Sequence, residues 1–155
     1  MKITKDHKFL GFIFVFICSA TITFASTRGV TNQEIRIGMH TDLSGPVAIS
    51  GVPSANAIRM YFEEVNARGG VRGRVLKLIV EDHQYQVPRA IQVANKLINR
   101  DQVFAMIGSL GTPMNNAVMK KQLANNIPNL FPYTAARSMV EPLHNRQIRA
   151  LLQPL

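Results

Sequence analysis

Cysteine and acidic residues are scarce in this chain of 155 residues, and each shortage narrows what the protein can be. The single cysteine excludes an intramolecular disulfide and a cysteine-rich zinc module. A phosphate-binding P-loop, a dinucleotide-binding glycine fingerprint, internal repeats and low-complexity segments are also absent from the sequence. The whole chain contains 46% hydrophobic and 17% charged residues, with 18 basic side chains against 9 acidic ones. This composition indicates a globular, strongly basic chain rather than a disordered one.

The first 25 residues differ from the rest. They contain five of the eight phenylalanines, and they begin with a stretch that carries three lysines and one aspartate. An uninterrupted apolar run follows over residues 9–17, and small and polar residues then lead to Ala25. This succession is typical of a secretory signal peptide, residues 1–25, for which we predict cleavage after Ala25, with Ala20 as the second choice.

Two other interpretations of this segment remain. The uncharged stretch over residues 9–25 is 17 residues long, the lower limit for a membrane-spanning helix, so an uncleaved anchor is one alternative. Cys18 suggests a lipoprotein site, but Ile17 stands before it where such signals need a small residue. We therefore interpret Cys18 as an apolar residue of the leader. Cleavage after Ala25 would leave a cysteine-free chain with a net charge of +7, because three lysines and one aspartate are removed.

Beyond residue 34, short β-rich segments alternate with segments of helical periodicity. We expect strands at residues 35–39, 75–80, 103–107, 129–131 and 147–152. Helices are expected to start near Pro53, at Pro88 and just after Thr112. Such an alternation is typical of an α/β fold built on a parallel sheet with right-handed crossovers.

Apolar spacing and end signals define these helices further. The inward faces are expected to be Ile58, Tyr61, Phe62 and Val65 in the first helix, and Ile91, Ala94, Leu97 and Ile98 in the second. Gly69-Gly70 would end the first helix by supplying a left-handed C-cap. Thr112 would cap the third helix, with Pro113 at its first position, and this helix would run to about Asn125.

Ligands of open α/β sheets bind beyond the carboxyl ends of the strands, which here are the loops at 40–52, 82–87, 108–112 and 132–137. The loop at 108–112 has the most specific chemistry. Its glycines permit close backbone approach, and Thr112 adds a hydroxyl where a helix start presents free N–H groups, which suits a carboxylate or phosphate. The alternative is a plain N-cap that serves only its own helix, and the residues by themselves favour that alternative.

Other polar residues at strand ends indicate structure rather than chemistry. Asp42 and Ser44 could be an acid and a nucleophile, but the sequence Asp-x-Ser-Gly-Pro is typical of a turn. His40, His83 and the Glu81-Asp82 pair could be metal ligands, but they are scattered singly, so we interpret them as solvated loop residues. No nucleophile, base or metal set converges, and we expect neither an enzyme nor a cofactor.

Two further features bear on possible partners. Tyr133 and Thr134 follow the fourth strand and could face the same cleft, although a packing role for the tyrosine is equally open. The net charge raises nucleic acid as a partner, and basic residues gather around the first helix–strand turn at Arg68, Arg72, Arg74 and Lys77. No aromatic residues interleave with them, and the leader directs the chain out of the cytoplasm, so we expect a solvated basic edge and no nucleic-acid partner.

A series of motifs carries a resemblance. In order, they are Ile37-Gly38, Leu43-Ser44-Gly45-Pro46, Gly51, the stretch from Glu64 to Arg74, Val80-Glu81-Asp82, Ala94-Asn95-Lys96-Leu97, and Val103-Phe104-Ala105-Met106-Ile107-Gly108. The chain resembles the type I periplasmic substrate-binding proteins of ABC transporters, specifically the branched-chain amino-acid (leucine/isoleucine/valine) receptor family. The best single signature is E-x-N-A-x-G-G-x-x-G-R from Glu64 to Arg74, and the resemblance covers about residues 34–142.

The resemblance implies a doubly wound parallel sheet as one of two α/β lobes, which close around a ligand by a hinge and deliver it to membrane permeases. Family members are more than twice as long and are not enzymes. Residues 26–155 would then be a truncated N-terminal lobe, with an uncovered last strand. A half-site of this kind is expected to bind weakly, because closure supplies much of the ligand's burial and desolvation.

The resemblance also implies a binding set, in which hydroxyls and backbone N–H groups after the third and fourth strands hold the ligand's carboxylate. The residues are Ser50, Leu110, Gly111, Thr112, Tyr133, Thr134 and Ala135. Thr112 matches a Ser/Thr position of the family, which now favours a ligand role over a plain cap. Ala135 stands at the family's threonine position after the fourth strand, with Thr134 one residue earlier. Related receptors often carry an aromatic residue near Ser50, and its absence here would leave more room or a more polar wall.

The function expected from the resemblance is that of a periplasmic solute-binding component of an ABC transporter. Its ligands would be amino acids of the branched-chain type or related small carboxylates, and its partner would be an ABC permease in the inner membrane. The full-length protein would be a monomer, and a fragment would have impaired binding. The alternative is an extracytoplasmic ligand-sensing domain without a transport role.

Overall fold

The computed structural model describes residues 27–139. In chain order it contains β1 (Glu34–Thr41), α1 (Ala48–Ala67), β2 (Val75–Asp82), α2 (Val87–Asn95), a π-helical turn (Lys96–Arg100), β3 (Ala105–Ile107), α3 (Thr112–Ala124), β4 (Asn129–Leu130) and a 3-10 turn (Arg137–Met139). The predicted leader and the predicted strand at 147–152 lie outside the described residues. Among the helices that are described, none combines the length and the apolar character needed to span a membrane.

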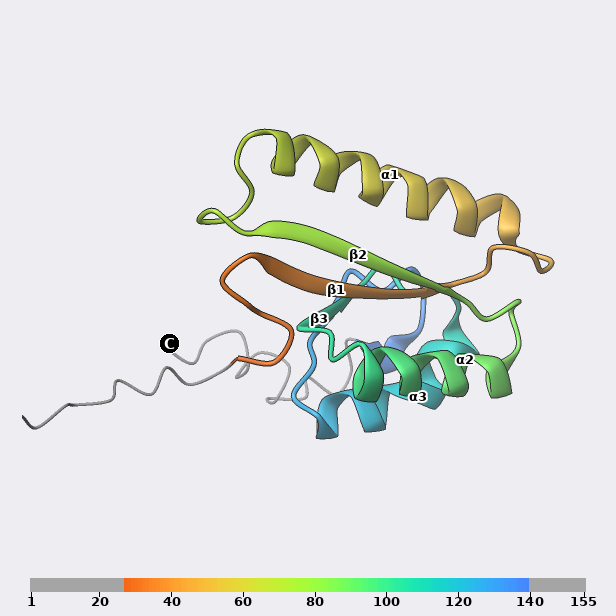
Figure 1. The fold of residues 1–155 in the computed structure, drawn as a ribbon. Coiled ribbons are helices and arrows are strands. Elements are labelled where there is room, and N and C mark those ends of the chain that lie inside the picture. The colour runs from red at the N-terminus through yellow and green to blue at the C-terminus, as the bar shows by residue number, and fades with distance from the viewer. Residues whose placement is uncertain (1–26, 140–155) are drawn as a thin grey trace, which may run out of the picture.

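The strands form a parallel sheet, which confirms the α/β prediction, and their order is β2-β1-β3-β4. The long pair β1 and β2 is in register from Glu34 opposite Val75 to Thr41 opposite Asp82. α1 covers one face of the sheet, while α2 and α3 lie side by side on the other face (Figure 1). The sheet is therefore doubly wound, and the order of the strands reverses between β1 and β3. The carboxyl ends of these two strands are the point where open α/β sheets bind ligands.

Two apolar clusters fill the space between the layers. The larger lies between the sheet and the α2–α3 layer and consists of Ala90, Ala94, Leu97, Ile98, Val103, Met106, Met114, Val118 and Ile127. The smaller lies against α1 and consists of Ile37, Phe62 and Ala105, with partly buried residues that include Ile58, Ile107 and Leu130. Gly38 belongs to the larger side, because a Cβ there would meet Val103 and Leu97 at 3.2 to 3.3 Å. β1 is thus covered on both faces, as a central parallel strand should be.

Helix α1 begins earlier than its proline suggested. The predicted start near Pro53 is wrong, since the helix begins at Ala48 and contains Pro53. The carboxylate of Asp42 explains the early start, because its two oxygens accept the backbone N–H groups of Gly45 at 2.5 Å and Val47 at 2.8 Å. Gly51 then lies so close to the Asp42 carbonyl oxygen that any Cβ would overlap it.

The carboxyl end of α1 agrees with the prediction. Gly69 and Gly70 have φ values of +96° and +70°. The Gly70 N–H donates to the Val65 carbonyl and the Gly69 N–H to the Asn66 carbonyl, each at 3.0 Å. These two bonds are the Schellman pattern, which satisfies carbonyls that a helix end leaves free.

The inward faces of two helices were partly mispredicted. Tyr61 is 60% exposed and Ile91 is 42% exposed. In α1 the buried residues are Gly51, Ala55 and Phe62, and in α2 they are Ala90 and Ala94. The helix faces that contact the sheet thus include small residues, which let the helices approach the sheet closely. The larger Tyr61 and Ile91 lie one position away from these faces.

Candidate functional site

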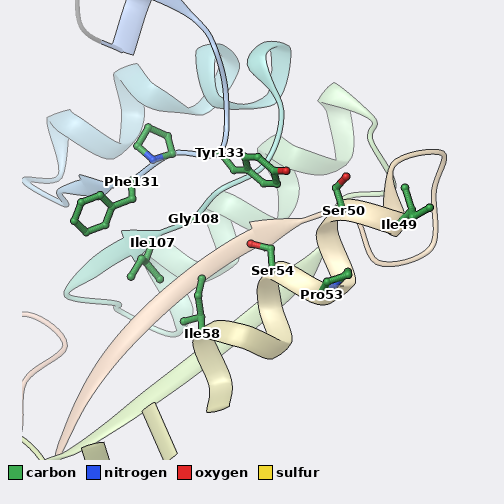
Figure 2. A pocket seen from close by; sticks show the side chains of 10 residues that line it. Ile49, Ser50, Pro53, Ser54, Ile58, Ile107, Gly108, Phe131 and Tyr133 are labelled. Atoms are coloured by element: carbon green, nitrogen blue, oxygen red, sulfur yellow. The ribbon is translucent and has the colours of Figure 1, made fainter. Parts of the chain in front are cut away.

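A hollow of about 700 Å³ lies at the carboxyl ends of β3 and β4, on the side of the sheet that α1 covers. Figure 2 shows how three segments form it: the first turns of α1, the end of β3, and the chain that follows β4. Its lining residues are Ile49, Ser50, Pro53, Ser54, Ile58, Ile107, Gly108, Phe131, Pro132 and Tyr133. The hollow therefore lies at the carboxyl edge of the sheet and borders the switch point, because α1 follows β1 and Ile107 ends β3. Its volume is in the range of small-molecule sites.

The lining is mainly apolar, and its polar side chains are hydroxyls. Ser50 and Ser54 are one turn apart on α1, and Tyr133 lies across the hollow from them (Figure 2). None of the lining residues is charged. Phe131 is 82% exposed and Tyr133 is 52% exposed, so both rings are accessible to a ligand. These features suit an uncharged, largely apolar group with room for a few hydrogen bonds.

A pair of threonine hydroxyls lies beside the chain segment that carries Tyr133. The Oγ1 atoms of Thr112 and Thr134 are 2.5 Å apart, although the two residues are 22 positions apart in the chain. The Thr134 hydroxyl also accepts the backbone N–H of Ala136 at 3.1 Å. The predicted cap role of Thr112 is wrong, because Gly111 is the cap residue, with φ of +95°, and Thr112 is the first residue of α3. Its hydroxyl is therefore turned to Thr134 rather than to its own helix.

Six of the seven predicted binding residues fall into three pairs, and Ala135 stands apart. Ser50 and Tyr133 line the hollow. Thr112 and Thr134 form the hydroxyl pair. Leu110 and Gly111 are buried and support the loop, since Leu110 forms a parallel bridge with Tyr133 and the Gly111 N–H donates to the Tyr133 carbonyl at 3.1 Å. Ala135 is exposed and lines no part of the hollow. Their ligand contacts stay a prediction.

The sequence pointed to only part of the hollow. Ser54, Ile58 and Ile107 were not predicted as site residues, because apolar residues in a helix and a strand look like ordinary core. Phe131 was assigned to a strand, whereas β4 ends at Leu130 and Phe131 follows with a positive φ of 48°. The available signal was the spacing of Ser50 and Ser54, because residues four apart share a face of a helix. The late predicted start of α1 hid it.

Both histidines at the strand ends are buried rather than solvated, which corrects their interpretation as loop residues. Burial, and secondarily the nearby His83, lowers the pKa of His40 to about 3. Burial also lowers the pKa of His83. The Nδ1 atom of His83 accepts the Tyr85 N–H at 3.0 Å, so its proton is on Nε2, which faces the Leu110 carbonyl at 3.1 Å. Both imidazoles are therefore neutral at pH 7.

Asp42 and Ser44 shape a turn, as predicted, because Asp42 accepts the N–H groups of Gly45 and Val47. Glu81 and Asp82 are the last residues of β2 and are half-buried, which corrects their interpretation as solvated loop residues. The Ser44 hydroxyl donates to Asp82 at 2.5 Å, and the Leu43 and Gln84 N–H groups donate to the same carboxylate at 2.9 Å. Burial by itself would raise the pKa of Asp82, but these hydrogen bonds outweigh it and lower the pKa. Over residues 27–139, no three His, Cys, Asp or Glu side chains gather as metal ligands.

Comparison with known proteins gives consistent matches. A family model described as "Periplasmic binding protein" matches residues 34–144. The Leucine-specific-binding protein of Salmonella typhimurium is 31% identical over 94 residues, which are 61% of this chain and 25% of that protein. The Leu/Ile/Val-binding protein of Escherichia coli K12 is 28% identical over 94 residues, with the same two shares. The chain thus spans about a quarter of the length of these relatives.

Solved structures agree with this picture. A possible leucine/isoleucine/valine-binding protein from Rhodopirellula baltica superposes with a TM-score of 0.68 and 26% identity, over 76% of this chain and 31% of that one. A fatty acid ABC transporter substrate-binding protein from Thermomonospora curvata superposes with a TM-score of 0.64 and 36% identity, over 68% and 26% of the two chains.

Proposed function

The chain belongs to the periplasmic binding protein family, and from this premise we propose that it is a ligand-binding module of an ABC transporter. Its ligands would be amino acids of the branched-chain type or related small carboxylates. The observation that carries this proposal is the hydroxyl pair Thr112–Thr134, which lies at the amino end of α3 and next in the chain to Tyr133 of the apolar hollow.

The hydroxyl pair and the apolar hollow offer complementary chemistry to one ligand. Two hydroxyls 2.5 Å apart can both turn their protons toward one carboxylate, and the amino end of α3 adds free N–H groups and the positive end of the helix dipole. The hollow offers aliphatic and aromatic side chains to the rest of the ligand. A molecule with a carboxylate at one end and an apolar group at the other would satisfy both parts.

The relatives support a ligand class rather than one ligand. Their printed names refer to leucine, to Leu/Ile/Val and to a fatty acid, all of which combine a carboxylate with an apolar chain. They are named binding proteins, and one is named a component of an ABC transporter, which favours transport over sensing or catalysis. The family description and the relatives' names support a periplasmic location and a non-enzymatic role, and we propose an inner-membrane permease as the partner. That the full-length protein acts as a monomer stays a prediction.

The affinity of this chain by itself should be low. The hollow that the described residues form is open to solvent, so a bound ligand would remain partly in water. Partial burial forfeits much of the hydrophobic gain, so we expect a dissociation constant of about 1 mM, which corresponds to only about 4 kcal/mol of binding free energy.

Titration calorimetry with leucine, isoleucine, valine, hexanoate and glycine tests the proposal. We expect the apolar carboxylates to bind and glycine not to bind. Thr112→Val and Thr134→Val keep the side-chain shape but remove the hydroxyl, so each should weaken binding by about tenfold, the effect of ~1.4 kcal/mol. Thr27→Val, whose side chain is exposed and remote in sequence from the site, is the matched control. Equal affinity of the parent and both site variants would refute the assigned role of the hydroxyl pair.

A further inference from the structure

Three consecutive carbonyl groups in the loop before α3 accept hydrogen bonds from buried side chains. The Asn115 amide donates to the Ser109 carbonyl at 2.8 Å and to the Gly111 carbonyl at 2.9 Å. The imidazole of His83 lies 3.1 Å from the carbonyl between them, that of Leu110. Both side chains are fully buried. The loop is thus held from inside the protein by two residues that line no part of the hollow.

The protonation of His83 fits this arrangement. Its Nδ1 accepts the backbone N–H of Tyr85 at 3.0 Å, which leaves the proton on Nε2 to be donated to Leu110. One ring therefore links the chain after β2 to the chain after β3. A side chain with a donor and an acceptor at opposite ends is needed to make both bonds.

Asn115 has a corresponding link to the last strand. Its Oδ1 accepts the Asn129 side-chain amide at 3.1 Å, which fixes its Nδ2 as the donor to the loop. Asn129 begins β4, the strand that leads to Tyr133 and Thr134. The amide thereby connects the loop after β3 with the strand that carries the second hydroxyl.

The direction of one peptide group follows from these bonds. The Gly111 carbonyl accepts from both the side chain and the backbone N–H of Asn115, at 2.9 and 3.0 Å, so it points into the first turn of α3. In a trans peptide the next N–H points the opposite way. The Thr112 N–H is therefore directed away from the helix, on the residue whose hydroxyl meets Thr134.

We propose that His83 and Asn115 are positioning residues, which hold the loop at 108–112 so that the hydroxyl and N–H of Thr112 are presented to the ligand's carboxylate. This inference rests on the proposed function of the site. The two side chains would not touch the ligand. They act through the backbone of Leu110 and Gly111.

Amide hydrogen exchange by NMR on the full 155-residue chain tests the proposal without a ligand. The probes are the Leu110 and Gly111 amides, which donate to the carbonyls of His40 and Tyr133 at 3.1 Å. His83→Phe keeps a ring but removes both nitrogens, and Asn115→Leu removes the amide at similar size. We expect each change to speed exchange at both probes by at least about tenfold, while amides in the central strand β1 stay protected.

Two further variants separate positioning from general packing. His83→Gln retains a donor and an acceptor and should restore most of the protection lost in His83→Phe. Gln122→Leu is the matched control, because Gln122 is equally buried on α3 and its side chain has no hydrogen-bond partner within residues 27–139. It should leave both probes unchanged. Loop exchange that is unaltered in both His83→Phe and Asn115→Leu, or altered equally in Gln122→Leu, would overturn the proposal.

A leucine titration of the same proteins completes the test. We expect about tenfold weaker binding in His83→Phe and Asn115→Leu and parent-like binding in His83→Gln and Gln122→Leu. Faster loop exchange with unchanged leucine affinity would overturn the positioning role. Absence of carboxylate binding by the parent chain would instead refute the proposed function, and the exchange data would still decide whether the two side chains hold the loop.

Discussion

At the scale of single residues, the neutral histidines are the most consequential buried groups. His40 is fully buried, and neither of its ring nitrogens has a hydrogen-bond partner among the described residues. The His83 ring lies 5.6 Å from it, centroid to centroid. A proton on His40 would therefore be a charge without a partner beside a second imidazole, a state that the fold penalises strongly.

Because of this penalty, we predict that lowering the pH destabilises the protein already at pH values well above those at which carboxylates titrate. The unfolded chain protonates His40 near pH 6.5, whereas burial and His83 lower its folded pKa to about 3. The contribution of neutral His40 to the free energy of unfolding is fully present above about pH 6.5. It is lost as the pH falls toward 3, because the unfolded state binds the proton first. Between pH 7 and pH 5 the free energy of unfolding should fall by about 2 kcal/mol from this residue.

Urea unfolding at pH 7 and pH 5 measures this fall in the free energy of unfolding. In His40→Leu most of the fall between the two pH values should be absent. Charged and titratable neighbours also shift the pKa values of the two histidines. His83 lowers the pKa of His40, and the carboxylates of Asp42 and Asp82 oppose the lowering of the pKa of His83 by burial. Asp82 has a lowered pKa and contributes only below about pH 4. Equal losses of stability in the parent and in His40→Leu would contradict the prediction.

At the scale of elements, α1 shows what the sequence could and could not reveal. Its end at Gly69-Gly70 was predictable, because a local pattern sets it. Its start was not, because Asp42 binds the N–H groups of Gly45 and Val47 and so starts the helix before Pro53. Thr112 and Thr134 were both predicted as binding residues, but the contact between their hydroxyls was not, since the two meet only through the pairing of β3 and β4.

The start of α1 leads to a prediction for Gly51. A Cβ at this residue would overlap the Asp42 carbonyl oxygen and lie 2.9 Å from the Thr41 hydroxyl, so Gly51→Ala should push the first turn of α1 off the sheet. We expect a loss of about 1–3 kcal/mol in unfolding free energy. Gly73→Ala is the control, since nothing lies within 4 Å of its Cβ position and only its positive φ of 78° opposes alanine, a cost of ~1 kcal/mol. Thermal unfolding compares the two, and a smaller effect at Gly51 than at Gly73 would contradict the assigned contact.

At the scale of the whole molecule, the two faces of the doubly wound sheet are covered differently, and the hollow lies on the face that α1 covers. α2 and α3 bury the larger apolar cluster on one face, whereas on the other face the first turns of α1 line the hollow (Figure 2). Ile49 and Phe131, at opposite sides of the hollow in Figure 2, are 86% and 82% exposed. Large exposed apolar side chains around a concave surface are typical of a binding site.

Phe131 therefore allows stability and ligand binding to be separated. Because its side chain is 82% exposed, Phe131→Ala should change the free energy of unfolding by no more than about 0.5 kcal/mol. If the ring forms a wall for the ligand's apolar group, its loss should weaken leucine binding about fivefold, the equivalent of ~1 kcal/mol of apolar contact. Tyr61→Ala is the matched control, since Tyr61 is an aromatic residue on α1 that is 60% exposed and lines no part of the hollow. Calorimetric titration of both variants with leucine distinguishes the two positions, and equal affinities would mean that the ligand's apolar group does not contact Phe131.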